Sequence, residues 1–426
     1  LKEMVKHTKG VTSYSYDVTC SGRPLITHLD QFAADALDSL RRIIEEEIRE
    51  LEQIDDLTRE NIAHEEFGKE RCRHFVGRQK ILDEIAAYIH GGQHFPLVIY
   101  GPSGSGKSAL MAKAFSIAAD KHKQAYIIQR FIGATPESTD IRSLLRNLCF
   151  EISQAFGFDR LKEQEQAGVT DPGAQDAVLE KYEIPEEYRY LSERFREFLG
   201  MIPLDRRLFL FLDALDQLNT TDSAHSLYWL PSKLPENVKI IVSVLERGDK
   251  AGECLRSARS KVSKSALLPL KDMTQKEGRQ VLLTWLLAAY PEKKRALTDE
   301  QLEHILAGFR GCPKPLYLKL AFEEARRWKS YDGLPCGADN VPGLGGDVTG
   351  IVGDMLARLR DKKQHGEVLV KTFLGLLSAA RHGLSETEIL ELLSGDEKVM
   401  ADLKARSARS PEAKGIPAVV WLRLYH

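Results

Sequence analysis

The sequence has no long apolar run. None of its apolar stretches reaches the roughly 18 residues that a membrane-spanning helix needs, and its first residues lack the apolar core of a secretory signal. We therefore expect no membrane association and a cytoplasmic location. Cysteine is also scarce: the 426 residues contain six, without a C-x-x-C pair. This favours reduced thiols over a disulfide framework or a zinc site.

An excess of charge of one sign is missing as well. Lysine and arginine number 60 and aspartate and glutamate 62, which leaves a formal net charge of −2. This balance lacks the basic excess that attracts nucleic acid in bulk, so a nucleic-acid partner is not expected. No internal repeat is present, and no histidine is assigned to a metal. The length and the ordinary composition indicate a globular protein of roughly three domains.

What the sequence does contain is a phosphate-binding motif. Residues 101–108 read GPSGSGKS, which matches G-x-x-x-x-G-K-[ST] at every fixed position, between an apolar stretch and a helical pattern. Glycines let such a loop turn so that successive N–H groups point inward, and the following helix adds its positive dipole end. Lys107 can reach the β- and γ-phosphates, and Ser108 can ligate Mg²⁺. The predicted nucleotide-binding residues of the loop are Gly101, Pro102, Ser103, Gly104, Ser105, Gly106, Lys107, Ser108 and Ala109.

Further candidates lie at the ends of two later apolar runs. The run RLFLFL ends at Asp213, which we expect to hold Mg²⁺ beside Ser108. Asp216 follows three residues later and is a candidate for orienting the attacking water. Ser243, in the run VKIIVSV, is either a hydrogen-bond donor to the γ-phosphate or a small residue packed in the sheet, and Arg247 is the alternative for the sensing role. The predicted catalytic set is Lys107, Asp213 and Asp216, and the predicted Mg²⁺ ligands are Ser108 and Asp213.

The alternation of apolar runs and helical patterns predicts a doubly wound α/β domain. In such a domain the phosphate loop and the strand ends meet at one edge of a parallel sheet. Residues 158–186 are polar and are expected to be an exposed irregular insertion. The expected strands are 96–100, 125–132, 207–213 and 238–244, and the expected helices are 79–90, 107–121, 141–156 and 188–199.

Beyond about residue 266 the sequence predicts helices and no further sheet strand. Thr274 and Glu277 form a capping box at the start of the first helix, and the Gly/Pro-rich stretch 331–350 predicts a hinge. The helices that follow the hinge, with a wing strand at 417–422, indicate a winged-helix domain. The expected helices are 274–290, 298–309, 316–328, 351–359, 367–379 and 385–393. An amphipathic helix over 29–51 and a partly helical polar linker over 55–70 precede the sheet.

These features together resemble STAND-class P-loop NTPases of the NACHT type. The resemblance covers residues 70–426 and rests on four segments: FVGR at 75–78, the GPSGSGKS loop, LFLFLDALDQL at 208–218 and CPKPLYL at 312–318. It implies a P-loop parallel sheet sandwiched by helices, followed by an all-helical domain and a winged-helix domain. The expected domains are an upstream tail and helical linker over 1–70, a nucleotide-binding domain over 71–262, a helical domain over 263–345 and a truncated winged-helix domain over 346–426.

The resemblance also implies residues that bind the base. The adenine-contacting proline of the family matches Pro315, with Pro313 as the alternative, and Val76 would pack on the adenine. The winged-helix histidine that reads ADP in this family has only weak candidates here, His382 and His426.

Two positions depart from the family pattern near the expected catalytic carboxylates. Ala214 stands where the family usually has glycine, and Gln217 stands where many members have glutamate. The second departure puts fast hydrolysis in question. The arginine often found at the end of the third strand has no clear match.

The activity that the resemblance implies is that of a slow ATP-hydrolysing switch with ATP/ADP and Mg²⁺ as ligands. ADP would hold the three domains closed, and exchange for ATP would open the hinge and expose an oligomerisation surface. The expected partners are nucleotide, further copies of the chain and an unidentified trigger, and the expected context is signal transduction in innate defence. Only a difference in affinity between the two arrangements can move such an equilibrium.

Two other functions stay open at this point. An AAA+-like DNA-binding ATPase also joins a P-loop domain to a winged helix, although this chain shows no dense Lys/Arg recognition helix. A nucleotide-binding scaffold without turnover needs only Asp216 and Ser243 to be misplaced. A P-loop metabolic kinase is disfavoured because no lid over an acceptor substrate is evident.

Overall fold

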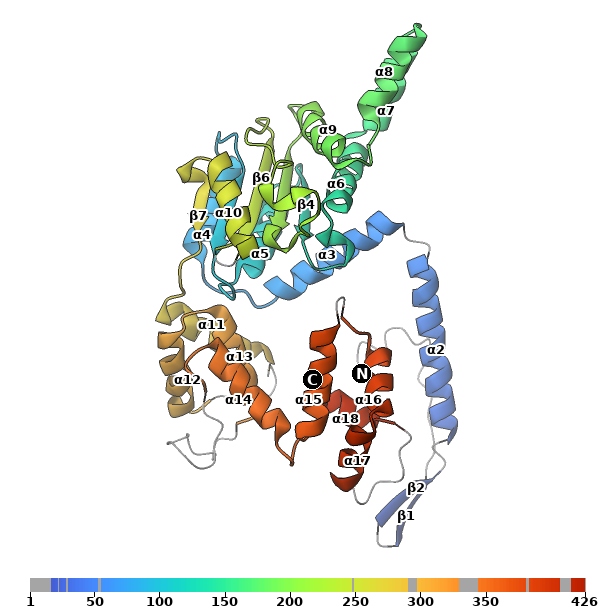
Figure 1. Cartoon of the computed structure of the whole chain (residues 1–426), viewed down its shortest axis with the longest axis vertical. Coiled ribbons are helices and arrows are strands. Elements are labelled where there is room, and N and C mark those ends of the chain that lie inside the picture. Colours follow the sequence, from blue (N-terminus) through green and yellow to red (C-terminus); the bar gives the residue numbers. More distant parts are fainter. Residues whose placement is uncertain are drawn as a thin grey trace. The chain divides into compact units, whose positions relative to one another are not determined.

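The structure is a computed structural model that describes residues 17–21, 23–27, 30–52, 55–246, 249–289, 297–328, 344–380, 383–406 and 415–425. It divides into two compact units, residues 1–63 and 64–426 (Figure 1). Each unit is described by itself. None of the described helices is long and apolar enough to cross a membrane.

The first unit consists of a hairpin and a long helix. Strands β1 (Asp17–Ser21) and β2 (Arg23–Thr27) pair antiparallel, and α2 (Asp30–Glu52) confirms the helix predicted over 29–51. Helix α3 (Asp56–Cys72) then runs from the first unit into the second. The polar linker predicted over 55–70 is therefore a continuous helix, stabilised by ion pairs such as Lys69–Glu65 at 2.8 Å, one turn apart.

The second unit is built on a parallel sheet with the strand order β4-β5-β6-β3-β7. Four strands confirm the predicted ones, and the fifth, a three-residue edge strand, was not expected. It pairs with β3 and ends at Pro269, so the sequence carries only a short signal for a strand. It also lies beyond the predicted domain boundary at residue 262. The strands are β3 (Leu97–Gly101), β4 (Tyr126–Phe131), β5 (Leu208–Asp213), β6 (Val238–Leu245) and β7 (Leu267–Pro269).

Helices cover both faces of this sheet because side chains alternate along each strand. On β5, Leu208, Leu210 and Leu212 enter one core, whereas Phe209 and Phe211 enter the other. The second core is closed by α4 (Gln79–His90) and α5 (Lys107–Lys121). The first core is closed by α6 (Ile141–Phe156), α9 (Tyr188–Met201) and α10 (Asp249–Lys261). The doubly wound α/β prediction is confirmed.

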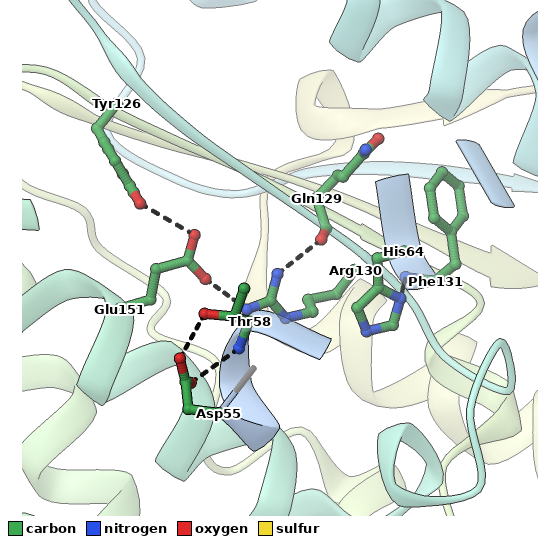
Figure 2. A network of polar contacts seen from close by, with 8 residues as sticks. All are labelled: Asp55, Thr58, His64, Tyr126, Gln129, Arg130, Phe131 and Glu151. Carbon is green, nitrogen blue, oxygen red and sulfur yellow. Dashed lines mark hydrogen bonds and ion pairs between the residues drawn. The ribbon is translucent and has the colours of Figure 1, made fainter. Parts of the chain in front are cut away.

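Strand β4 forms an edge of the sheet, and polar side chains close around it (Figure 2). The backbone N–H of Phe131 donates to Nδ1 of His64 on α3 at 3.1 Å. On the strand itself, Arg130 is 3% exposed and forms an ion pair with Glu151 of α6, which also accepts a hydrogen bond from Tyr126 at 3.2 Å. The bond to His64 occupies one backbone N–H of this edge, and such coverage helps to keep an edge strand from pairing with another chain.

The region 158–186 is helical, and the prediction of an irregular insertion was wrong. Helices α7 (Phe158–Ala167) and α8 (Pro172–Tyr182) form a hairpin that extends away from the sheet (Figure 1). Lys181 pairs with Glu165 across the hairpin at 2.7 Å. The overlooked signal was Asp171 as N-cap with proline at the next position, where a helix tolerates the missing N–H.

After the sheet, the helical domain is confirmed. Its helices are α11 (Gln275–Ala289), α12 (Asp299–Gly311) and α13 (Pro315–Ala325). The capping box of Thr274 and Glu277 is present, with N–H groups of both residues bonded to the partner side chain at 2.8 and 3.2 Å. Helix α14 (Val348–Arg360) packs Ile351 into this core. Residues 331–343 of the predicted hinge lie outside the described residues.

The last helices enclose a separate core with Trp421 buried at 3% exposure. They are α15 (Glu367–Ala379), α16 (Glu386–Gly395), α17 (Glu397–Arg406) and α18 (Ala418–Tyr425). The wing strand predicted at 417–422 was wrong, because this segment forms α18. A short apolar run fits a helix or a strand equally well from sequence. The short 3₁₀ helices are η1 (Glu137–Thr139), η2 (Leu215–Gln217), η3 (Thr221–Ser226) and η4 (Lys264–Ala266).

Candidate functional site

The phosphate-binding motif lies between β3 and α5, as predicted. Gly104 and Gly106 have φ values of +74° and +90°, in the region that side chains disfavour, so the turn needs glycine there. Lys107 starts α5, and its ammonium donates to the carbonyls of Gly101 at 2.9 Å and Pro102 at 3.1 Å. The ammonium thus bonds to carbonyls of its own loop.

One hydroxyl of the loop has no protein partner. Ser105 is 3% exposed, and its Oγ lies buried without a hydrogen bond to any described residue. A buried polar atom without a partner costs free energy, and the oxygen of a phosphate in the loop is a group that could satisfy it. The loop therefore fits the group that its sequence motif implies.

Asp213 lies at the end of β5 beside the loop. Its side chain is buried, at 3% exposure for the residue, and its Oδ1 accepts a hydrogen bond from Ser243 Oγ at 2.5 Å. Burial raises the pKa of Asp213, while hydrogen bonds from Ser108 and Ser243 and the charge of Lys107 act in the opposite direction. The structure thus brings Asp213, Ser108 and Lys107 together, as the sequence predicted.

Ser243 has a different place from the predicted one. The residue is fully buried, and its hydroxyl donates to Asp213 and accepts from the Ala214 N–H at 2.9 Å. Both sides of the hydroxyl are engaged within the protein. We therefore assign Ser243 to positioning Asp213 rather than to a contact with the γ-phosphate. Arg247, the alternative for that contact, lies outside the described residues.

Asp216 lies on η2, one short turn after Asp213. Its Oδ1 accepts from the backbone N–H of Leu245 at 2.7 Å, which fixes the carboxylate at the end of β6. Burial lowers the pKa of Lys107, and the charges of Asp216, Asp213 and Glu246 oppose this shift. Asp216 therefore belongs electrostatically to the same site, where its role in orienting water stays a prediction.

The two departures from the family pattern have structural counterparts. Ala214 has φ +62° and ψ 54°, a left-handed conformation that costs an L-residue about 1–2 kcal/mol. The glycine usual in the family avoids this strain. Gln217 lies against the loop after β4, since a Cβ on Gly133 would lie 2.3 Å from its Oε1.

The N-terminus of α13 lies directly on the phosphate loop. The Leu316 N–H donates to the Gly104 carbonyl at 3.2 Å. A Cβ on Gly104 would lie 2.9 Å from the Leu316 Cβ, and one on Gly106 would lie 3.3 Å from the Pro315 Cγ. Pro315, predicted from the resemblance, is therefore at the loop. The Pro313 carbonyl instead accepts from the Met273 N–H at 3.1 Å.

Arg78 is a residue of the site to which the sequence assigned no role. It is buried, and its guanidinium donates to the Ser105 carbonyl in the loop at 3.3 Å and to the Asp272 carbonyl at 3.4 Å. Burial lowers the pKa of Arg78, while the charges of Glu277 and Asp272 oppose the shift. The FVGR segment was the signal, but only the fold shows what its arginine reaches.

The remaining predicted residues divide between two places. Val76 is half-buried and packs against the core of the helical domain. Ser103 is exposed in the loop, and Ala109 is half-buried on the first turn of α5. His382 and His426, the weak candidates for reading ADP, lie outside the described residues.

The donor set fits Mg²⁺. Ser108 and Asp213 supply a hydroxyl and a carboxylate, and Mg²⁺ prefers oxygen ligands, usually one or two carboxylates together with substrate phosphates. Among the described residues no group of three or more His, Cys, Asp or Glu side chains could hold a metal. A cation here would accordingly depend on the phosphates for part of its coordination.

Comparison with known proteins agrees with this organisation. A model described as an AAA ATPase domain matches residues 74–242, and one described as an NWD1-like, winged helix-turn-helix domain matches residues 344–414. Human NACHT domain- and WD repeat-containing protein 1 is 29% identical over 357 residues, which are 82% of this chain and 21% of that protein. Human NACHT and WD repeat domain-containing protein 2 is 27% identical over 390 residues, 89% of this chain and 20% of that protein.

Among solved structures, the chain is similar to one titled as Drosophila ORC bound to DNA. The identity is 15%, the coverage is 85% of this chain and 88% of that one, and the TM-score is 0.40. The chain spans about a fifth of the length of the curated relatives that it matches.

Proposed function

We propose that this chain is an ATP/ADP-binding switch. The proposal is supported by the matches to models of an AAA ATPase domain and an NWD1-like winged-helix domain, and by the similarity to NACHT and WD repeat-containing proteins 1 and 2. The nucleotide state of the chain controls the arrangement of the helical and winged-helix regions and, through it, oligomerisation. The context that the family resemblance implies is cytoplasmic signal transduction in innate defence, with an unidentified partner as the trigger.

The observation that carries this proposal is the contact of the α13 N-terminus with the phosphate loop. The Leu316 N–H donates to the Gly104 carbonyl, so a change in the loop's conformation changes the position of the helix. A ligand shifts a conformational equilibrium only through differential contacts with the two states. This direct contact between the loop and the helical domain supplies a place for such a difference.

The residues of the loop have distinct tasks in this proposal. Lys107 leaves the carbonyls of Gly101 and Pro102 to bind phosphate oxygens, and the N–H groups at the start of α5 bind the same anion. Ser108 and Asp213 would hold Mg²⁺, which supplies neutralisation of the charge on the β- and γ-phosphates. Asp216 orients water, and Gln217 in place of a carboxylate keeps turnover slow.

The test is the nucleotide that the purified protein carries. The protein is denatured, and the released nucleotide is separated by chromatography and quantified. Lys107→Ala is the loss-of-binding variant, and Lys121→Ala, an exposed lysine at the far end of the same helix, is the matched control. We expect stoichiometric ADP in the unmodified chain and in Lys121→Ala but not in Lys107→Ala. A protein that is empty and also fails to bind ATP with Mg²⁺ would refute the switch.

A further inference from the structure

Helix α13 is held at both of its ends. Its N-terminus contacts the phosphate loop through Pro315 and Leu316. Near its C-terminus, Glu324 is 5% exposed and forms a two-bond ion pair with Arg358 of α14. The Nη2–Oε1 distance is 2.8 Å and the Nε–Oε2 distance is 3.1 Å. One helix therefore connects the loop to α14.

The part of α13 between these contacts is stiff. After Pro315 at its first position the helix contains neither proline nor glycine, so nothing in its sequence favours a kink. The nine helical steps from Pro315 to Glu324 span about 14 Å at 1.5 Å per residue. Tyr317 and Leu318 are fully buried in the core that also takes Ile351 of α14. A shift of the helix N-terminus must consequently move the C-terminal end as well.

The ion pair fixes the geometry between α13 and α14 more than it adds to stability. Burying two charges is costly, and hydrophobic residues of similar volume often serve stability equally well. Here the hydrogen-bonding groups of the pair are not all satisfied, because the Arg358 Nη1 is buried without a partner among the described residues. The two-bond geometry fixes the angle and the register between the helices, as planar guanidinium–carboxylate pairs do.

Beyond α14 the packing changes. Residues of α14 enter the core of the helical domain, whereas the core of the last helices begins with Leu369 of α15. Gly366, between the two helices, has φ +78° and ψ 157°, a conformation that is essentially restricted to glycine. The chain therefore passes from one packed body to the next at Gly366, directly after α14.

From these contacts we propose that Glu324 and Arg358 are positioning residues of the nucleotide site. They act through α13 and transmit the state of the phosphate loop to α14 and thereby to the winged-helix region. This inference rests on the proposed nucleotide switch. It adds to that switch the two residues that connect the phosphate loop, through α13 and α14, to the winged-helix region.

The experiment measures the transmission and the binding separately. Fluorophores are placed on the full chain at Lys121 and Lys404, two exposed lysines on α5 and α17. Energy transfer is recorded without nucleotide, with ADP and with a non-hydrolysable ATP analogue, all with Mg²⁺. Affinities for both nucleotides are measured by titration on the same samples. The variants are Glu324→Gln, Arg358→Gln and the apolar pair Glu324→Leu with Arg358→Met.

Glu323→Gln is the matched control. Glu323 is the neighbouring carboxylate on α13, and it forms ion pairs with Lys319 and Arg326, each within one turn along the chain. The control variant therefore removes a charge from the same helix without touching the pair with α14. Thermal unfolding of each variant shows which of them are folded, and the apolar pair preserves the buried volume if a single variant fails to fold.

We expect the unmodified chain and Glu323→Gln to change energy transfer between ADP and the ATP analogue. In Glu324→Gln, Arg358→Gln and the apolar pair this change disappears, while both nucleotides still bind. The ratio of ADP to ATP affinity shifts by about fivefold or more, because coupling between two sites is reciprocal. A merely structural role would lower stability but leave this ratio unchanged.

Each contrary result has its own meaning. If the unmodified chain binds no nucleotide, the proposed function fails, and this inference fails with it. If the unmodified chain binds nucleotide without a change in energy transfer, binding stands and the transmission is refuted. If folded Glu324→Gln or the apolar pair responds like Glu323→Gln, the ion pair does not transmit the state of the loop to α14.

Discussion

Replacing Ser243 with alanine tests how the buried carboxylate at the end of β5 is held. The Ser243 hydroxyl donates to Asp213 at 2.5 Å in a fully buried setting. A hydrogen bond to a charged group contributes about 1.5–3 kcal/mol, which corresponds to roughly tenfold to a hundredfold in an equilibrium constant. Without the donor, the pKa of Asp213, already raised by burial, rises further. The carboxylate then competes less well for Mg²⁺ against a proton.

The assay is a titration of fluorescent ATP and ADP, each with and without Mg²⁺, across a pH series. We expect Ser243→Ala to weaken binding of both Mg²⁺-nucleotides by about tenfold to a hundredfold, with little effect on Mg²⁺-free ADP. The loss grows as the pH falls, because the proton and the metal compete for the same oxygens, and the midpoint of this dependence lies at higher pH than in the unmodified protein.

The matched control for this variant is Ser192→Ala. Ser192 is equally buried, but its hydroxyl donates to the Tyr188 carbonyl within α9 at 2.7 Å. It should leave nucleotide binding unchanged. The result that would refute the reasoning is a Ser243→Ala loss confined to ATP and independent of Mg²⁺. That pattern means that the hydroxyl contacts the γ-phosphate, as the sequence alone allowed.

Two further predictions concern stability. Ala214→Gly removes the left-handed strain at φ +62° and should raise the free energy of unfolding by up to about 1 kcal/mol, after the greater flexibility of glycine is subtracted. A lower free energy of unfolding, measured by denaturant titration, would contradict the strain. Burial lowers the pKa of His122, helped by the nearby charges of His90, Arg207 and Lys121. The contribution of neutral His122 to stability is therefore complete above the pKa of the unfolded state, near 6.5, and is lost as the pH falls through and below that value. The urea midpoint should therefore fall less steeply with decreasing pH in His122→Gln than in the unmodified protein. An equal dependence of the midpoint on pH in both proteins would contradict the lowered pKa.

Most of the sheet domain was predictable because its signals are local. Apolar runs of strand length marked β3 to β6, helical periodicity marked α4, and the phosphate-binding motif marked the start of α5. Several elements were missed or assigned to the wrong class, and three cases show the physical reasons. Strand β7 has three residues and ends in proline. The hairpin of α7 and α8 is polar and carries too few apolar positions to show a periodicity. Helix α18 is a short apolar run whose form depends on tertiary packing.

The site divides in the same way between local and distant information. The phosphate loop is contiguous, so its residues follow from the sequence. Arg78 and Ser243 act through partners that lie 27 and 30 positions away, Ser105 and Asp213. No pattern along the chain shows that Ser243 holds a carboxylate or that Arg78 holds a carbonyl of the loop. The register of the sheet, in which β5 and β6 are neighbours, decides the first, and the approach of the start of α4 to the phosphate loop decides the second.

Gly104 shows how the two kinds of information meet in one residue. In the pattern G-x-x-x-x-G-K-[ST] it occupies a free position, so phosphate binding alone does not require glycine there. The structure gives two reasons for it: φ is +74°, and a Cβ would lie 2.9 Å from the Leu316 Cβ. The second reason concerns the helical domain and not the ligand. The loop is thus shaped on one side for an anion and on the other for α13. Because both sides share one short backbone segment, we expect an anion in the loop and the position of α13 to be coupled.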